Sequence, residues 1–214
     1  MPQVSVLSVA SHGEAFDTLQ HLLKKQTFQD FEFIGEVGED FPGVWVNVIK
    51  KATGDILVFI DSGARPVSDR WLEEMVTSVV DNRTVIKGLE VTGFPLDPSS
   101  LAGHRQAFID QPFDESYPWA EDTELFCRLK ENGFRFNQLE NAPVIHLSKP
   151  GSKTYVKRAF RYGMYRSRMY HRFSKPIELA NPILAMKQII AIFLNQLGTI
   201  FGFLFSWIER GDKR

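Results

Sequence analysis

The first 150 residues alternate between apolar runs and stretches whose apolar residues recur at helical spacing. Short apolar runs are typical of strands, and we expect strands at Val4–Ala10, Phe31–Val37, Ile56–Ile60, Thr84–Val91, Phe134–Leu139 and Val144–His146. Helical spacing occurs around Leu19–Leu23, in Val44–Ala52, after Ser68 and in Trp119–Asn132. The helix after Ser68 is expected to be capped by that serine and to bury Leu72, Met75, Val76, Val79 and Val80. This order predicts an α/β domain with a mostly parallel sheet.

The last third of the chain has a different pattern. Residues 153–175 contain eight Lys or Arg residues, no acid and six aromatic residues, and residues 189–208 follow without any charge. A helix of that length would span about 30 Å, the thickness of a bilayer core. Asn195 and Gln196 near its middle weaken a spanning interpretation, so an amphipathic surface helix and a core or dimer helix stay open. The basic flank favours a membrane anchor on the cytoplasmic side.

Charge is divided unevenly along the chain, although the net charge is only −1. Residues 1–148 carry 12 basic and 23 acidic residues, and residues 149–214 carry 13 and 3. An acidic body of this kind repels a polyanion, which argues against nucleic acid as a partner. The single Cys127 excludes an internal disulfide and a cysteine-cluster zinc site. Val4–Ala10 lacks the basic start of a secretory signal, so we expect the body in the cytoplasm.

An apolar strand that ends in an acid is the first candidate for chemistry. Ala52-Thr53-Gly54-Asp55 leads into Ile56–Ile60, and Asp61-Ser62-Gly63 follows. Ligands of open α/β sheets bind at the carboxyl ends of strands, where an acid can hold a ribose hydroxyl or a metal-bound phosphate. The same pattern also fits a plain turn in which the aspartate stabilises the chain reversal.

Carboxylates crowd one predicted helical turn, which contains Glu121, Asp122 and Glu124. A carboxylate in a pocket can act as the general base that takes a proton from an acceptor hydroxyl. Acids in a first helical turn are also favoured by the helix dipole alone. His146 ends a short strand, where a histidine is usually structural, but beside phosphates it could ligate a metal or donate to a pyrophosphate oxygen.

In this order the three features resemble the inverting family 2 glycosyltransferases, which have the glycosyltransferase A fold. The segment Glu121-Asp122-Thr123-Glu124-Leu125, with Arg128 and Gly133, matches that family's helix, and the strand that ends at Asp61 matches its donor strand. Smaller matches are Gln26-Thr27, Gly43, Asn47, Gly103-His104-Arg105 and Phe113-Asp114-Glu115. The resemblance covers roughly residues 4–173.

The resemblance implies a single Rossmann-like glycosyltransferase A domain at residues 1–150, followed by basic and hydrophobic helices at 151–214. It implies that Asp61 holds the ribose and the metal–diphosphate of a nucleotide-sugar donor, and that Asp122 is the catalytic base. The other substrate-contacting residues that it implies are Glu36, Arg105, Glu121 and His146.

The predicted metal site departs from the family's Asp-x-Asp motif, because Gly63 replaces the second acid. Three alternatives follow from this difference. Asp61, His146 and the donor's phosphates could hold Mg²⁺ or Mn²⁺. Basic residues, for example within Lys149–Arg158, could neutralise the leaving diphosphate without a metal. The protein could also be catalytically inactive.

The expected function is inverting transfer of a sugar to a hydroxyl or phosphate acceptor at the cytoplasmic face of the cell membrane. The predicted anchor favours a polyprenyl phosphate or a lipid-linked glycan as acceptor. Gly63 favours the alternative of a non-catalytic nucleotide-sugar-binding or scaffolding subunit of a membrane glycan-assembly complex. A nucleotidyltransferase is the third option, and the Glu121–Glu124 segment and His146 argue against it. The sequence leaves the oligomeric state open, with a homo-oligomer among the options.

Overall fold

The structure is a computed structural model of the 214-residue chain. It describes residues 3–91, 100–118, 120–146, 169, 172 and 173. The chain separates into two compact units, Met1–Pro176 and Ile177–Arg214, and every described residue belongs to the first. Among the described residues, no helix combines the length and the apolar character needed to cross a membrane. The charge-free run at 189–208 lies outside these residues, so the membrane helix and the domain boundary near residue 150 stay predictions.

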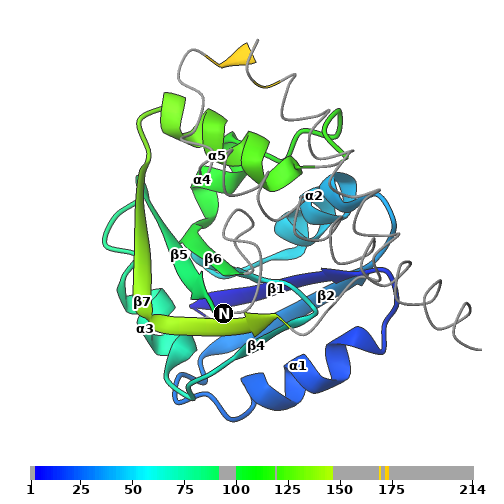
Figure 1. The fold of residues 1–214 in the computed structure, drawn as a ribbon, viewed down its shortest axis with the longest axis vertical. Coiled ribbons are helices and arrows are strands. Elements are labelled where there is room, and N and C mark those ends of the chain that lie inside the picture. Colours follow the sequence, from blue (N-terminus) through cyan, green and yellow to red (C-terminus); the bar gives the residue numbers. More distant parts are fainter. Residues whose placement is uncertain (1–2, 92–99, 119, 147–168, 170–171, 174–214) are drawn as a thin grey trace, which may run out of the picture. The chain divides into compact units, whose positions relative to one another are not determined.

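Seven strands in the described part of the chain form one sheet, in the order β2-β1-β3-β6-β5-β7-β4 (Figure 1). The strands are β1 (Val4–Ala10), β2 (Phe31–Val37), β3 (Ile56–Ile60), β4 (Ala64–Pro66), β5 (Thr84–Glu90), β6 (Ser100–His104) and β7 (Arg135–His146). The helices are α1 (Ala15–Leu23), α2 (Phe41–Lys51), α3 (Trp71–Thr77), α4 (Arg105–Asp110) and α5 (Glu121–Glu131).

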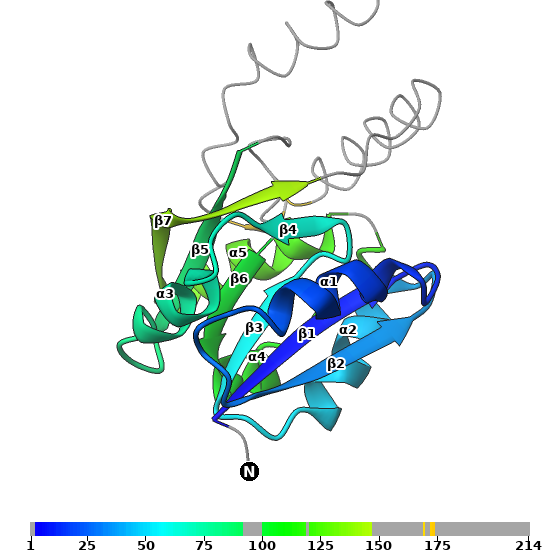
Figure 2. The same cartoon turned by 90° about the horizontal axis from the view of Figure 1, so that it is seen from below.

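Strand direction divides the sheet into a parallel part and a mixed part. Figure 2 shows β2, β1 and β3 side by side, and both of their pairings are parallel. Strand β6 runs antiparallel to β3 and β5, β7 runs parallel to β5, and β4 runs antiparallel to the end of β7. The α/β fold expected from the sequence is confirmed, and the antiparallel pairings all involve β4 or β6, which the apolar pattern did not predict.

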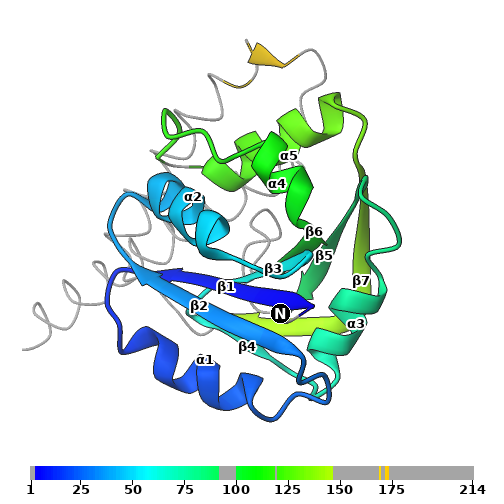
Figure 3. The ribbon, with the colours of Figure 1, turned by 180° about the vertical axis from the view of Figure 1, so that it is seen from behind.

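Helices cover both faces of the sheet, as Figure 3 shows for α1 and α2 on opposite sides of β1. Val4, Val6 and Val58 pack with residues of α1 and α3. Leu7, Leu57 and Phe59 lie on the opposite face with residues of α2, α4 and α5. Strands β1 and β3 are therefore buried at every position because each of their faces is covered, and only Ser5 and Ser8 of β1 interrupt their apolar sequences.

Three details of the predicted elements were wrong. Helix α3 ends at Thr77, and Val80, predicted to face inward, is 73% exposed; the β-branched residues Val79 and Val80 favour the helix weakly. Ser68 does not cap that helix at its first turn, because its Oγ accepts the backbone N–H of Arg70 at 3.1 Å and the helix starts at Trp71. The two short strands expected at 134–139 and 144–146 are one strand, β7, with an irregularity opposite Gly88 and Leu89.

Candidate active site

The carboxyl ends of β2, β1 and β3 form one edge of the sheet, and two predicted site residues lie there. Val9 of β1 pairs with Glu36 of β2, and Leu7 of β1 pairs with Phe59 of β3, two residues before Asp61. Neighbouring strands are about 4.8 Å apart, so Glu36 and Asp61 lie at the same level roughly 10 Å apart across β1. The structure therefore brings Asp61 to the edge where α/β sheets bind ligands.

The turn after Asp61 brings His146 to the same place. The backbone N–H of Ala64 donates to the carbonyl of Asp61 at 2.9 Å, which closes a tight turn before β4. Ala64 then pairs with His146 at the end of β7. Residues 85 positions apart in the chain thus share one corner of the sheet, because β4 and β7 pair antiparallel there.

Aromatic stacking ties the loop before α5 to this edge. Phe113 stacks on Trp45 of α2 with ring centroids 5.7 Å apart and meets Phe59 of β3 edge-on at 6.1 Å. The carboxyl carbon of Glu115 lies 4.0 Å from the point where a Cβ on Gly43, in the first turn of α2, would stand. The Phe113-Asp114-Glu115 segment therefore lies beside the carboxyl edge of β3, on the face that α2 covers.

Helix α5 carries the predicted base at its start, directly after a strained residue. Ala120 is fully buried and has a left-handed backbone with φ 64° and ψ 31°, which is rare for a residue other than glycine. Its carbonyl accepts the N–H of Glu124 at 3.0 Å. The half-buried Asp122 accepts hydrogen bonds at Oδ1 from the N–H of Thr123 at 2.6 Å and from its hydroxyl at 3.3 Å. These bonds fix the orientation of the Asp122 carboxylate.

Glu124 is not a solvated acid at a helix start, because its side chain is fully buried. Its two oxygens accept from Nε of Arg128 at 3.0 Å and from Nη2 at 2.9 Å, which is a bidentate ion pair at i,i+4. Arg128 also donates to Gln111 and to the carbonyl of Pro112. The pair holds α5 against the loop that precedes it.

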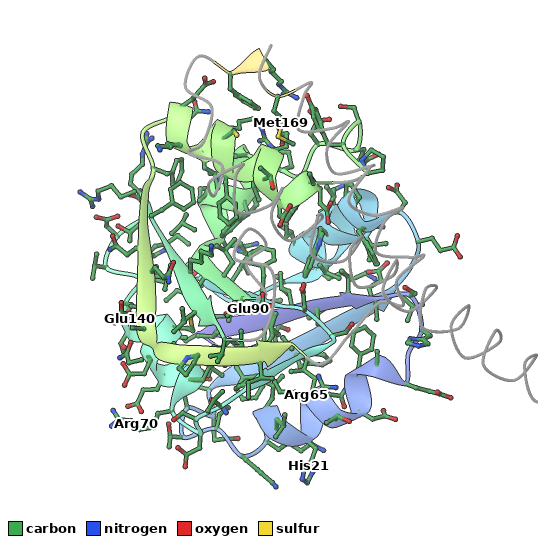
Figure 4. The ribbon with its side chains drawn as sticks, viewed as in Figure 1. His21, Arg65, Arg70, Glu90, Glu140 and Met169 are labelled. Carbon is green, nitrogen blue, oxygen red and sulfur yellow. The ribbon has the colours of Figure 1, made fainter. Side chains whose placement is uncertain are left out.

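Arg172 joins this network from a distant part of the sequence. Its guanidinium bonds Asp114 at 2.7 Å, lies 3.4 Å from Glu124 and covers the ring of Tyr117 at 5.4 Å. Figure 4 shows Met169, a buried neighbour of Arg172 in the sequence, beside α5. Arg172 therefore contacts both the loop before α5 and Glu124 in the first turn of that helix.

The Asp114 carboxylate is held in its charged form by these contacts. Partial burial would raise its pKa, but hydrogen bonds from Ser116 and from Arg172 outweigh burial and lower the pKa to about 2. The hydrogen bond to Asp114 also raises the pKa of Arg172. Each group thus stabilises the charge of the other beside α5.

Of the other predicted residues, Glu121 begins α5 beside Asp122, Glu36 lies at the carboxyl edge of the sheet, and Arg105 does not. Glu36 forms an ion pair with Lys51 of α2 at 2.7 Å at the carboxyl edge. Arg105 follows β6, which runs antiparallel to β3, so it lies at the opposite end of β3 from Asp61. Its N–H donates to the carbonyl of Asp55 at 2.8 Å and its Nη1 to that of Ala52 at 3.3 Å. The structure does not bring Arg105 to the other candidates.

Known proteins match this chain in their structures but not in their sequences. No protein-family model matches the chain, and a search of curated proteins found no match. Solved structures do match. The mannosyltransferase PcManGT from Pyrobaculum calidifontis, in complex with GDP-Man and Mn²⁺, is similar with a TM-score of 0.68 and 13% identity over 87% of this chain. The chain has a glycosyltransferase-A-like fold.

S. aureus TarS supports the same fold. Its 1–349 form in complex with UDP matches with a TM-score of 0.54 and 15% identity over 77% of this chain, and a second TarS structure matches with 0.55 and 18% over 73%. The chain spans 69% of the mannosyltransferase and 65% and 38% of the two TarS chains. At these identities the similarity establishes the fold, and the activity has to be inferred from the site.

Three features of the site carried no recognised signal in the sequence. Arg172 stood among eight basic residues of a segment interpreted as a membrane flank, and its partner Asp114 is 58 positions away. The left-handed backbone of Ala120 has no signature, since glycine or asparagine is the usual residue there. Arg65 belongs to no recognised motif, and only the antiparallel pairing of β4 with the distant strand β7 gives its backbone a fixed place.

Proposed function

We propose that the protein is a glycosyltransferase that moves a sugar from a nucleotide-sugar donor to an acceptor hydroxyl or phosphate, with inversion at the anomeric carbon. One observation carries this proposal: in a glycosyltransferase-A-like fold, Asp61 follows β3 at the carboxyl edge of the sheet, and the Phe113-Asp114-Glu115 loop, which leads to α5, packs against the end of the same strand. The solved relatives were bound to GDP-Man with Mn²⁺ and to UDP, which supports a nucleotide-sugar donor.

In the proposed reaction, Asp122 removes the proton of the acceptor while the acceptor oxygen attacks the anomeric carbon. The bond between that carbon and the donor's phosphate oxygen breaks, and the nucleoside diphosphate leaves with the electron pair. Asp61 binds the donor's ribose and diphosphate, and Glu36 contacts the nucleoside. Glu121, beside Asp122, positions the acceptor. These roles are the ones that the family resemblance implies for the four residues.

A divalent metal fits this site only in part. No three His, Cys, Asp or Glu side chains gather into a metal site within the described residues. Asp61 and His146, whose backbones share one corner, are the residues that would hold Mg²⁺ or Mn²⁺, and diphosphate oxygens would complete the ligand shell. When bound, the metal would neutralise the charge that develops on the leaving diphosphate.

The proposed association with the membrane rests on the sequence alone. The basic residues 153–175 and the charge-free residues 189–208 support attachment to the cytoplasmic face of the cell membrane, and hence a polyprenyl-phosphate or lipid-linked glycan acceptor. Full-length protein should float with vesicles that contain anionic lipid and bind neutral vesicles less. Full-length protein that stays unbound by both at low salt would contradict the anchor.

The donor site is tested by calorimetric titration with UDP and GDP. Asp61→Ala should weaken binding about 10- to 100-fold, the effect of losing a charge-assisted hydrogen bond. Asp55→Ala is the matched control, because Asp55 is exposed at the other end of β3 and should bind as the wild type does. Equal affinity of Asp61→Ala and wild type would show that the nucleotide binds elsewhere.

Gly63 favours one second candidate, a non-catalytic nucleotide-sugar-binding or scaffolding subunit of a membrane glycan-assembly complex. This candidate predicts the same nucleotide affinity as the enzyme and no transfer. Wild-type protein that binds UDP or GDP but consumes no nucleotide sugar in the presence of membrane lipids would favour it.

A further inference from the structure

Arg65 lies in β4, four residues after Asp61, and its guanidinium folds back over the intervening turn. Nη1 donates to the carbonyls of Ser62 and Ala64, each at 2.7 Å. Figure 4 shows Arg65 beside the end of β7, where His146 pairs with Ala64. The cation therefore lies on the turn that holds Asp61 and next to the strand end that holds His146.

The charge of Arg65 is not compensated within the part of the chain that the structure describes. None of the ion pairs between described residues includes Arg65. Its Nε is buried and lacks a hydrogen-bond partner there. Burial lowers the pKa of Arg65, and no carboxylate of a described residue offsets this effect.

Arg128, a structural arginine of the same fold, has a paired charge. That side chain is 16% exposed and is held by the carboxylate of Glu124 in a bidentate pair. A partly buried cation without a counter-ion destabilises a folded protein. The contrast indicates that the counter-charge of Arg65 comes from a bound ligand.

We propose that Arg65 binds the diphosphate of the nucleotide-sugar donor; this inference rests on the function proposed above. A guanidinium presents five N–H donors in a planar fork that matches phosphate oxygens. Main-chain carbonyls take the donors of Nη1, and neither Nε nor Nη2 has a hydrogen-bond partner among the described residues, so one complete side of the fork remains for the anion.

The position of Arg65 also accounts for the missing acid of the Asp-x-Asp motif. Gly63 removes one negative charge from the turn, which weakens its hold on a divalent cation. Arg65, two residues later in β4, adds one positive charge that its side chain holds against this turn. The positive charge that a metal-free site requires therefore comes from the turn itself, and the residues of Lys149–Arg158 are not needed to supply it.

The test is a titration of the full-length protein with UDP, GDP, uridine, guanosine and inorganic pyrophosphate, in EDTA and again in Mn²⁺. In EDTA, Arg65→Gln should weaken the binding of UDP or GDP about 10- to 100-fold. It should leave the affinity for the bare nucleoside unchanged, a result that a purely structural role does not produce. Arg65→Lys keeps the charge without the fork and should give an intermediate loss. In Mn²⁺ the loss should be smaller.

Arg70→Gln is the matched control, since Arg70 is an exposed arginine already paired with Glu73 and Glu74, and its variant should bind like the wild type. Ligand-free Arg65→Gln should unfold at or above the wild-type temperature. If Asp61→Ala loses nucleotide affinity while Arg65→Gln keeps it, the role of Arg65 is overturned and the proposed function stands. If the wild type binds neither nucleotide nor pyrophosphate, both are overturned. An equal loss of nucleoside and nucleotide affinity in Arg65→Gln also overturns the phosphate contact.

Discussion

Replacing Glu124 by glutamine should destabilise the protein strongly, although the two side chains have nearly the same size. The carboxylate is fully buried and accepts from Arg128 at 3.0 and 2.9 Å, with Arg172 at 3.4 Å. Glutamine keeps one acceptor oxygen, loses the charge and turns an N–H₂ group toward two cations. Arg128 would then be left with the neutral acceptors Gln111 and Pro112.

The magnitude follows from the burial of the partners. Breaking a buried ion pair by removing one partner costs about 3–5 kcal/mol. Arg128 is 16% exposed and Arg172 keeps its bond to Asp114, so we expect the lower end, about 3 kcal/mol. For a domain of this size that corresponds to a fall in Tm of roughly 6–12 °C.

Urea unfolding followed by tryptophan fluorescence measures this effect. Glu73→Gln is the matched control, because Glu73 is 40% exposed, pairs with Arg70 on the surface of α3 and should lose no more than about 0.5 kcal/mol. The double variant Glu124→Met/Arg128→Met removes both charges and should recover part of the loss. A Glu124→Gln protein as stable as Glu73→Gln would refute the buried network.

Two further predictions concern the surroundings of the site. The pKa of Asp114 falls from 3.8 to about 2 on folding, so its ionisation stabilises the fold fully above pH 3.8 and the effect is lost as pH falls through about 2. This pKa difference corresponds to at most about 2.4 kcal/mol, and solvent screening reduces it to about 1 kcal/mol. In urea unfolding between pH 6 and 2, the wild type should therefore lose its extra free energy of unfolding over Asp114→Asn as the pH falls through this window. A difference that stays constant with pH would contradict the assignment. Gly54→Ala should lose about 1–3 kcal/mol, because its Cβ would stand 2.6 Å from the backbone N of Ser5. Gly13→Ala, whose Cβ meets only a side chain at 3.9 Å, should stay within about 0.5 kcal/mol of wild type, and equal losses would show that the close approach does not matter.

The apolar pattern of the sequence predicted the strands that bury large apolar side chains. Strands β1 and β3 were found because both faces of each are covered by helices. Strand β6 is just as buried, but its interior positions are small: Phe108 lies 3.1 Å from the point where a Cβ on Gly103 would stand, and Gly88 lies against Ser100. Close packing against bulky neighbours thus removed the apolar signal of β6.

The missed strand explains why one site residue was misplaced. The family resemblance alone implied that Arg105, which follows β6, contacts the substrate together with Asp61. Because β6 runs antiparallel to β3, its end pairs with Ile56, the first residue of β3. The apolar pattern of the sequence did not reveal β6, so it could not predict the direction in which β6 runs.

Short sequence motifs correctly predicted the positions of residues that lie within the motifs themselves. Asp61 follows its strand, and Asp122 lies in the first turn of α5, as the motifs indicated. The contacts that hold α5 in place come from Asp114 and Arg172, and no short motif encodes pairing over 58 positions. Part of the recognised pattern is structural, since Gly54 permits the close approach of β1 and Glu124 anchors Arg128.

The most direct test of the account is the rate of sugar transfer by Asp122→Asn, measured with the full-length protein, UDP- and GDP-sugars and membrane lipids as acceptors. Asparagine keeps the size of the side chain and the oxygen that accepts from Thr123, but it cannot take the acceptor's proton. We expect kcat to fall about 10²- to 10⁴-fold, while the affinity for UDP or GDP stays within about twofold, the pattern of an interaction made only in the transition state. Transfer by Asp122→Asn at the wild-type rate would contradict the assignment of Asp122 as the base.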